Sequence, residues 1–132
     1  MHVSRTALAL AGAMTMSCGS SAAPPLTGQW GGDRAQLTLE LSGGRIEYDC
    51  GAGTIEAPLV LDAKGNFSVP GKHEDYQPGP TAADAVLALR AALYRGSVAG
   101  DRMSLTVQVT GDKRPRTITL VRGQRVKLVR CL

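Results

Sequence analysis

The sequence predicts an all-β protein, a small antiparallel up-and-down β-barrel of about eight strands with one short helix. Apolar and polar residues alternate with a period of two in one segment after another, as in strands with one buried face. Turn signals separate these segments at hairpin spacing, so successive strands are expected to pair as antiparallel neighbours. Because about eight strands in about 105 residues hide both edges most economically by closure, we expect a barrel. A two-sheet β-sandwich is the alternative.

Residues 1–23 have the composition of an export signal, and residues 26–132 are expected to form a single domain. Arg5 precedes a short run of small apolar residues, and Ser, Gly and Ala follow that run. The run is shorter than the roughly 20 apolar residues that cross a bilayer. We therefore expect an exported protein, located in the periplasm or cell envelope or secreted.

Two processing routes are open for this segment. The run Ser20-Ser21-Ala22 fits ordinary signal cleavage, which would release a soluble protein that begins near Ala23. Cleavage before Cys18 would instead give a lipoprotein with an acylated thiol and a lipid anchor in the membrane. Either route removes Cys18 from disulfide chemistry.

Four segments show the strand alternation most clearly, and turn signals lie between and after them. The segments are 36–41, 46–49, 55–62 and 103–110. The turn signals are 43–44, 63–66, 100–101, 111–112 and 122–124. A last strand is expected after residue 124, with Val126 and Leu128 on its core face.

Residues 81–94 break the period of two. The first four of them are typical of a helix N-terminus, and Val86, Leu89 and Leu93 fall on one helical face before Tyr94. We therefore expect the short helix between the fifth and sixth strands, across one end of the barrel. It would be a packed plug or, alternatively, a lid over a ligand mouth.

The first strand carries Gly28-Gln29-Trp30, a Gly-x-Trp motif. This motif resembles the opening of the calycins, the barrel superfamily of lipocalins and avidins. The resemblance implies that Trp30 closes one end of the barrel against a basic side chain from the last strand. That side chain would be Arg130, stacked on the indole as a cation–π contact.

A longer resemblance covers residues 26–132. The chain resembles a family of small exported bacterial proteins of uncharacterised function in the runs 28–32, 46–55, 94–105 and 128–132. The resemblance implies the fold and the compartment, and it brings no catalytic residue to carry over.

Cys50 and Cys131 are the two cysteines left in the mature chain, and an oxidising compartment favours their pairing. The bridge would close a loop of about 80 residues and stabilise the protein by roughly 4 to 5 kcal/mol. We expect it at one rim of the barrel. Two unpaired thiols are the alternative.

Basic residues gather near the C-terminus, where seven of them follow Asp112 and no acid does. Arg114, Arg116, Arg125 and Lys127 are expected to form a basic contact face for lipid headgroups, polysaccharides or acidic proteins. An ordinary solvated face is the alternative. We do not expect nucleic acid as a partner, because an exported chain rarely meets it and only five residues are aromatic.

His73-Glu74-Asp75 is the one cluster with acid–base character in the mature chain. On a strand His73 and Asp75 would share one side, and Glu74 would face the other. Zinc needs three or four ligands, so we expect no metal and no cofactor. Ordinary loop polarity is the favoured interpretation, and a catalytic role for His73 is the alternative.

These observations favour a non-enzymatic binding or interaction module, expected to be a monomer. Its ligand would be a small apolar or amphipathic molecule inside the barrel, or its partner an envelope protein. The barrel would hold no pocket if its interior were filled by Leu37, Leu39, Leu59, Leu105 and Val107. A lipoprotein that inhibits a hydrolase is one alternative. An enzyme is another, although no nucleophile elbow, phosphate loop or metal spacing appears.

Overall fold

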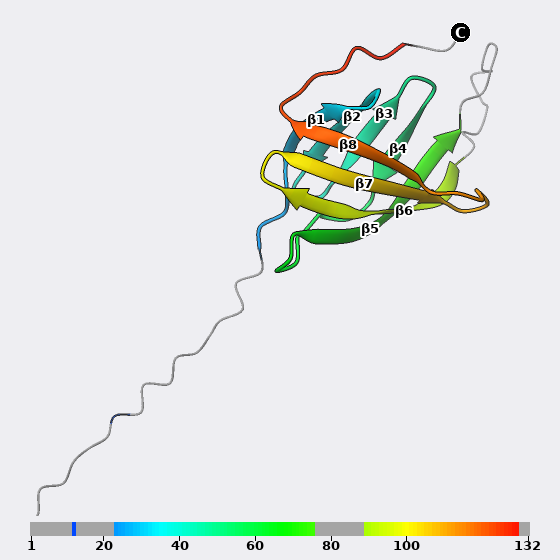
Figure 1. Ribbon diagram of the computed structural model, residues 1–132. Coiled ribbons are helices and arrows are strands. Elements are labelled where there is room, and N and C mark those ends of the chain that lie inside the picture. Colours follow the sequence, from blue (N-terminus) through cyan, green and yellow to red (C-terminus); the bar gives the residue numbers. More distant parts are fainter. Residues whose placement is uncertain (1–11, 13–22, 76–88, 130–132) are drawn as a thin grey trace, which may run out of the picture.

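Residue 12 and residues 23–75 and 89–129 are described by the computed structural model. These residues form eight antiparallel β-strands closed into a barrel, in which each strand pairs with its chain neighbours and β1 pairs with β8 (Figure 1). The strands are β1 Gly28–Gly32, β2 Ala35–Glu40, β3 Gly43–Tyr48, β4 Gly51–Ile55, β5 Asn66–Asp75, β6 Leu89–Ala99, β7 Arg102–Val109 and β8 Arg116–Arg122. The predicted closed barrel is confirmed, and the β-sandwich alternative is wrong.

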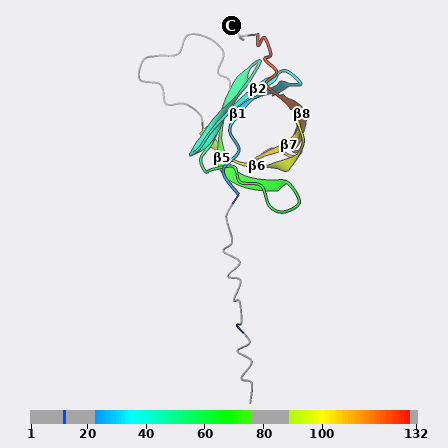
Figure 2. The ribbon, with the colours of Figure 1, turned by 90° about the vertical axis from the view of Figure 1, so that its left-hand side faces the viewer.

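The barrel has two different ends, which follow from the alternating strand directions. One end, called the Trp30 end, carries the start of β1, the loop 56–65 and the turn 100–101. The other end, called the mouth, carries the β3–β4 turn, the end of β5, the start of β6 and the segment 110–115. Seen along its axis, the barrel is a closed ring of strands (Figure 2).

Side chains from all eight strands fill the interior as one apolar cluster. Five residues would leave no internal pocket if they filled the barrel, and all five are buried, with at most 4% of their surface exposed: Leu37, Leu39, Leu59, Leu105 and Val107. Burial of this kind is the main stabilising contribution to such a small domain. Space for a ligand inside the barrel is therefore expected only near one of its ends.

Tyr94 of β6 is packed tightly against two glycines, one in β5 and one in β4. A Cβ at Gly53 would lie 2.1 Å from Oη of Tyr94, and one at Gly71 would lie 2.6 Å from its Cε2. The hydroxyl donates a hydrogen bond of 2.8 Å to the carbonyl oxygen of Lys72. These glycines are needed because the aromatic ring occupies the space of their missing side chains.

The helix predicted over 81–94 is wrong for its last six residues, which lie in β6. Leu89 and Leu93 face outward with 52% and 38% of their surface exposed, whereas Tyr94 is fully buried. Their spacing of four matches a strand face as well as a helical one, and pairing with β5 and β7 decides between them. Residues 81–88, which include Val86, lie outside the described part.

The strand predicted over 55–62 is also wrong, because β4 ends at Ile55 and residues 56–65 form a loop. Leu59 is nevertheless fully buried. Its carbonyl accepts a 2.8 Å hydrogen bond from the amide of Leu26, so the loop is fixed to the chain entering β1. Leu59 thus packs into the core from the Trp30 end rather than from a strand.

No strand follows β8 in the described residues, so the strand predicted after residue 124 is wrong. The turn predicted at 122–124 is present, and the amide of Gln124 donates a 3.2 Å hydrogen bond to the carbonyl oxygen of Val121. Both edges of β8 are already paired, with β7 and with β1. Residues 124–129, called the tail, instead cross the outer side of β1 and β2: a Cβ at Gly31 would lie 2.3 Å from the carbonyl oxygen of Gln124. The amide of Val126 donates to Oε1 of Gln36 at 2.9 Å.

Candidate functional site

Polar side chains replace apolar ones where the inward face of the barrel reaches the mouth. In β5 the inward positions change from Phe67 and Val69 to His73 and Asp75. His73 pairs in register with Arg90 of β6, and Val107 of β7 pairs with Arg116 of β8. The interior therefore ends in a polar cluster formed by Tyr48, His73, Asp75, Arg90 and Arg116.

A pocket of about 170 Å³ opens at this cluster. Its lining residues are Tyr48, His73, Val107, Val109, Asp112, Arg114 and Arg116. The two valines and the tyrosine ring provide apolar walls, while the other residues provide polar and charged groups. The volume is below the roughly 300 Å³ at which drug-sized sites begin, so it suits a small molecule or one head group.

Two buried polar atoms of this cluster have no hydrogen-bond partner among the described residues: the Tyr48 hydroxyl and Nδ1 of His73. Tyr48 is only 8% exposed. Burial raises its pKa to about 12, against the opposing charge of Arg116, so the hydroxyl stays protonated and can donate a hydrogen bond. Buried polar groups are nearly always paired in folded proteins, so these two atoms are available to bond to a molecule in the pocket.

His73 and Asp75 share the inward side of β5, as their spacing predicts. Nε2 of His73 lies 3.7 Å from Oδ1 of Asp75, and the His73 ring lies 6.1 Å from the ring of Tyr48. The cluster lies at the end of β5, so its expected place in a loop is wrong.

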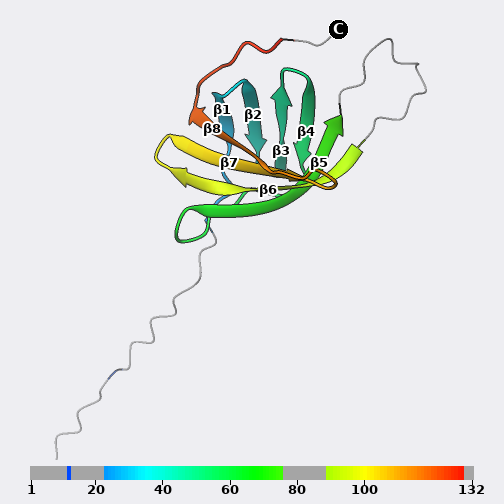
Figure 3. The same cartoon turned by 45° about the vertical axis from the view of Figure 1, so that its right-hand side comes forward.

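Arg90 binds two aspartates of the mouth, Asp75 and Asp112. Its Nε and Nη2 donate to the two carboxylate oxygens of Asp75 at 2.7 and 2.6 Å, and its Nη1 donates to Asp112 at 2.8 Å. The hydrogen bonds from Arg90 lower the pKa of Asp75 below its ordinary value. Figure 3 shows the start of β6 beside the end of β5 and the turn after β7, the three places that Arg90 joins.

Arg114 and Arg116 have no ion pair and no side-chain hydrogen bond in the part of the chain that the structure describes. The guanidinium carbon of Arg116 lies 4.7 Å from the centre of the Tyr48 ring, a cation–π contact. Arg116 also contributes at longer range to the lowered pKa of Asp49, after the hydrogen bonds that Asp49 accepts from Val129 and Arg34. Among the described residues that line the pocket, Arg114 and Arg116 are therefore cations without an ion pair.

Trp30 is fully buried at the other end of the barrel, and its ring is covered by Arg122. The guanidinium carbon of Arg122 lies 4.4 Å from the ring centre, and Nε lies 3.6 Å from Asp101. The last strand thus supplies a cation to the tryptophan, as the calycin resemblance implies, but the residue is Arg122. Arg130, to which the resemblance assigns that position, lies outside the described residues.

The basic contact face predicted from sequence is divided in the structure. Arg114 and Arg116 line the mouth, whereas Arg125 and Lys127 are exposed on the tail. Cys50 follows β3 in the turn to β4. Cys18 and Cys131 lie outside the described residues, so the predicted lipidation and disulfide stay predictions.

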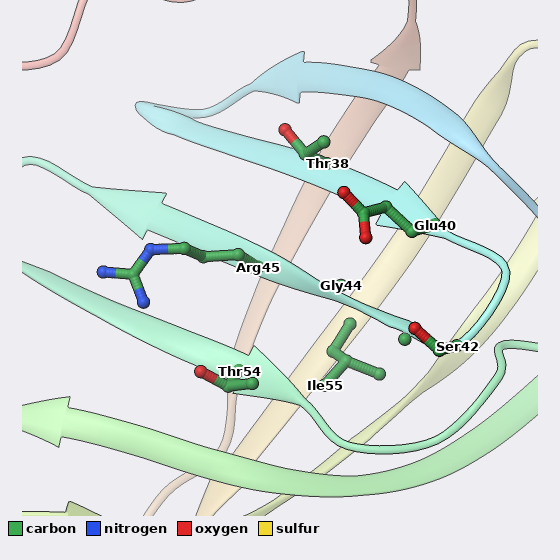
Figure 4. A pocket seen from close by; sticks show the side chains of 8 residues that line it. Thr38, Glu40, Ser42, Gly44, Arg45, Thr54 and Ile55 are labelled. Atoms are coloured by element: carbon green, nitrogen blue, oxygen red, sulfur yellow. The ribbon is translucent and has the colours of Figure 1, made fainter.

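A second hollow, of about 290 Å³, lies on the outer face of β2, β3 and β4 (Figure 4). Gly43 and Gly44 leave space there between Thr38, Glu40 and Thr54. The charge of Arg45 is compensated by Glu74 at 3.1 Å and Glu47 at 3.5 Å. None of the buried polar atoms without a partner belongs to this hollow, so the mouth is the stronger candidate site.

Within residues 23–75 and 89–129 no group of three or more His, Cys, Asp and Glu side chains is placed to hold a metal ion. The same residues include no helix with the length and apolar character to span a membrane. Comparisons of the chain with protein families, with characterised proteins and with solved structures find no match. The mouth of the barrel is therefore the feature on which a proposed function rests.

Sequence reasoning missed two residues of the mouth, Tyr48 and Arg90. Tyr48 lies two residues after Ile46 on the same strand, so its burial is predictable from the alternation. Nothing in the local sequence shows that its hydroxyl has no hydrogen-bond partner among the described residues. Arg90 falls in the segment predicted as a helix, where its pairing with His73 is invisible.

Proposed function

We propose that the protein is a non-enzymatic binding module of the bacterial cell envelope that holds a small ligand in the mouth of its barrel. The observation that carries the proposal is the pair of buried atoms without a partner, the Tyr48 hydroxyl and Nδ1 of His73, beside an open pocket. Leaving such groups unpaired costs about 1 to 3 kcal/mol each, which a ligand would recover by bonding to them.

The ligand is small and amphipathic rather than wholly apolar. The Trp30 half of the interior is filled with side chains, so the deep apolar site that the barrel alone suggests has little support. At the mouth, Val107 and Val109 offer a short apolar wall opposite charged groups. A molecule with a compact polar head and a short apolar part matches this division.

Binding is favoured over catalysis by the chemistry of the lining. His73 and Asp75 would make an acid–base pair, but the distance of 3.7 Å between them is long for a hydrogen bond. The lining residues that the structure describes include no serine, cysteine or lysine, and the raised pKa of Tyr48 makes its hydroxyl a poor nucleophile.

Export and a bridge between Cys50 and Cys131 are part of the proposal. The amide of Val129 donates a 2.9 Å hydrogen bond to Oδ1 of Asp49. This contact brings the chain two residues before Cys131 beside the residue that precedes Cys50. It supports a bridge at the rim of the mouth, in the oxidising compartment that an export signal implies.

Native mass spectrometry of the protein purified from its own envelope tests the function. We expect extra mass under native conditions that disappears on denaturation, and we expect His73→Ala to lose it. Lys72→Ala is the matched control, because Lys72 neighbours His73 but faces the other side of β5. A wild-type protein that carries no extra mass and binds nothing from an envelope extract would contradict the proposal.

A further inference from the structure

Within the part of the chain that the structure describes, the charged side chains that line the pocket do not pair with one another. Arg114 and Arg116 line it together with Asp112. Arg90 binds Asp112 through one hydrogen bond as well as Asp75 through two. The carboxylate that lines the pocket, that of Asp112, is therefore already neutralised by Arg90 at 2.8 Å. Asp49, in the β3–β4 turn, is a further acid at this end of the barrel, and Arg116 acts on it only at longer range. The positive charge that is left in the pocket lining belongs to Arg114 and Arg116.

The free hydrogen-bonding groups of the pocket are mostly donors. A guanidinium has five N–H donors and no acceptor, and Arg114 and Arg116 use none of them in the described part of the chain. Tyr48 adds a buried O–H, and Nδ1 of His73 adds a second buried atom without a partner. A ligand that satisfies this set has to accept several hydrogen bonds at once.

Arg116 is also held in place. Its guanidinium carbon lies 4.7 Å from the centre of the buried Tyr48 ring, which restricts the side chain before any ligand arrives. A restricted cation loses less conformational entropy on binding than a free surface arginine does. Arg116 is exposed like Arg125 and Lys127 of the tail, and this contact with the Tyr48 ring is what separates it from them.

We propose that the mouth binds an oxyanion, the carboxylate or phosphate group of a small ligand, between Arg114 and Arg116 with a hydrogen bond from the Tyr48 hydroxyl. This inference rests on the proposed function and specifies its ligand. Guanidinium groups bind carboxylate and phosphate through paired N–H donors, which gives both charge and geometry. The remainder of the ligand lies against Val107 and Val109, the apolar side of the pocket.

Calorimetric titration of the mature protein with benzoate and with benzamide tests the charge of the ligand. The two probes have nearly the same shape, and only benzoate is an anion. We expect benzoate to bind at least about tenfold more tightly, and Arg116→Gln to remove about tenfold of that affinity. Arg125→Gln is the matched control, because it removes the same charge from the exposed tail.

Arg114→Gln provides a second variant if Arg116→Gln unfolds, which a thermal melt will show. Competition by inorganic phosphate would assign a phosphate rather than a carboxylate. Sedimentation with phosphatidylglycerol vesicles distinguishes a lipid headgroup from a free anion, because only the former would carry the protein down in an Arg116-dependent way.

The two proposals fail differently. Equal binding of benzamide and benzoate, or unchanged benzoate binding in both arginine variants, would overturn the oxyanion inference and leave a binding site at the mouth. Failure of every probe to bind or to displace the mass retained from the envelope would also overturn it. Absence of both probe binding and retained mass would overturn the proposed function as well.

Discussion

Single residues of this barrel are constrained most strongly where Tyr94 crosses the interior. Its ring takes the space that side chains at Gly53 and Gly71 would occupy, and its hydroxyl is bonded to the backbone of β5. The glycines are therefore required by a neighbour rather than by their own backbone conformation, since neither has a positive φ. This makes them sensitive to the smallest possible substitution.

Gly71→Ala is expected to destabilise the protein by about 1 to 3 kcal/mol, the usual cost of overpacking. The new methyl group would lie 2.1 Å from the carbonyl oxygen of Thr54, a backbone atom that cannot move without disturbing β4. Urea unfolding measures the loss. Gly51→Ala is the control, because its methyl group would come no closer than 3.4 Å to its neighbours. Equal stability of the two variants would contradict the account.

The sequence predicts single residues well where alternation alone decides their side. Leu37, Leu39, Leu105 and Val107 lie on the buried side of their strands, as the alternation predicts. Leu59 is buried too, but from a loop, so alternation does not explain it. Arg130, to which the resemblance assigns the contact with Trp30, lies outside the described residues, and Arg122 makes the observed contact. The turn at Asp33 and Arg34 was also missed, since both have positive φ without being glycine or asparagine.

Elements are joined at the mouth by Arg90, which connects β5, β6 and the segment after β7. The sequence could not reveal this connection, because Leu89 and Leu93 have a spacing that a helix and a strand share. Arg90 and Tyr94 point to the inner side of the barrel because β6 pairs with β5 and with β7, and this pairing cannot be read from the local sequence. Local pattern is thus overridden by tertiary pairing.

Acid should weaken this connection. The hydrogen bonds from Arg90 lower the pKa of Asp75 in the folded protein from its ordinary value of 3.8. A lowered pKa means that the stabilisation is complete above the unfolded-state value and is lost as the pH falls through the folded-state value. We expect the melting temperature to fall below about pH 4, and to fall less steeply in Asp75→Asn.

Arg90→Gln is the companion variant, because it removes the cause of the lowered pKa and should flatten the same part of the curve. The melting temperature is measured at intervals between about pH 6 and pH 2. Parallel acid curves for the wild type and Asp75→Asn would contradict the assignment.

The tail is an element that no periodicity predicts. It is fixed by the amide of Val126 on Gln36 and by the amide of Val129 on Asp49, both at 2.9 Å. We expect Gln36→Ala to release it, with faster amide hydrogen exchange at Val126 corresponding to about 1 kcal/mol. Thr38→Ala is the control on the same side of β2, where no bond to the tail is made. Unchanged exchange at Val126 would show that other contacts fix the tail.

At the scale of the whole molecule, the closed barrel is predictable from the sequence and the composition of the mouth is not. Short amphipathic segments with hairpin turns leave few ways to hide strand edges, so the eight-stranded barrel is predictable. The mouth is not, because Tyr48, His73, Arg90 and Arg116 come from four strands and meet only through register.

Reduction of the proposed Cys50–Cys131 bridge should lower the free energy of unfolding by roughly 4 to 5 kcal/mol, since it would open a loop of about 80 residues. Denaturant unfolding with and without a thiol reductant measures the change, and Cys50→Ser should reproduce it. A loss below about 1 kcal/mol, or free thiols in the protein isolated from the envelope, would contradict the bridge.

The chain enters the barrel at the Trp30 end, where the amide of Leu26 is bonded to the loop 56–65 (Figure 1). Acylation of Cys18 would therefore attach the lipid to that end, only a few residues before the first described segment. The barrel would stand with its tryptophan-capped base toward the bilayer and its arginine-lined opening toward the aqueous space. The opening at which we propose oxyanion binding would then lie at the end of the barrel opposite the lipid.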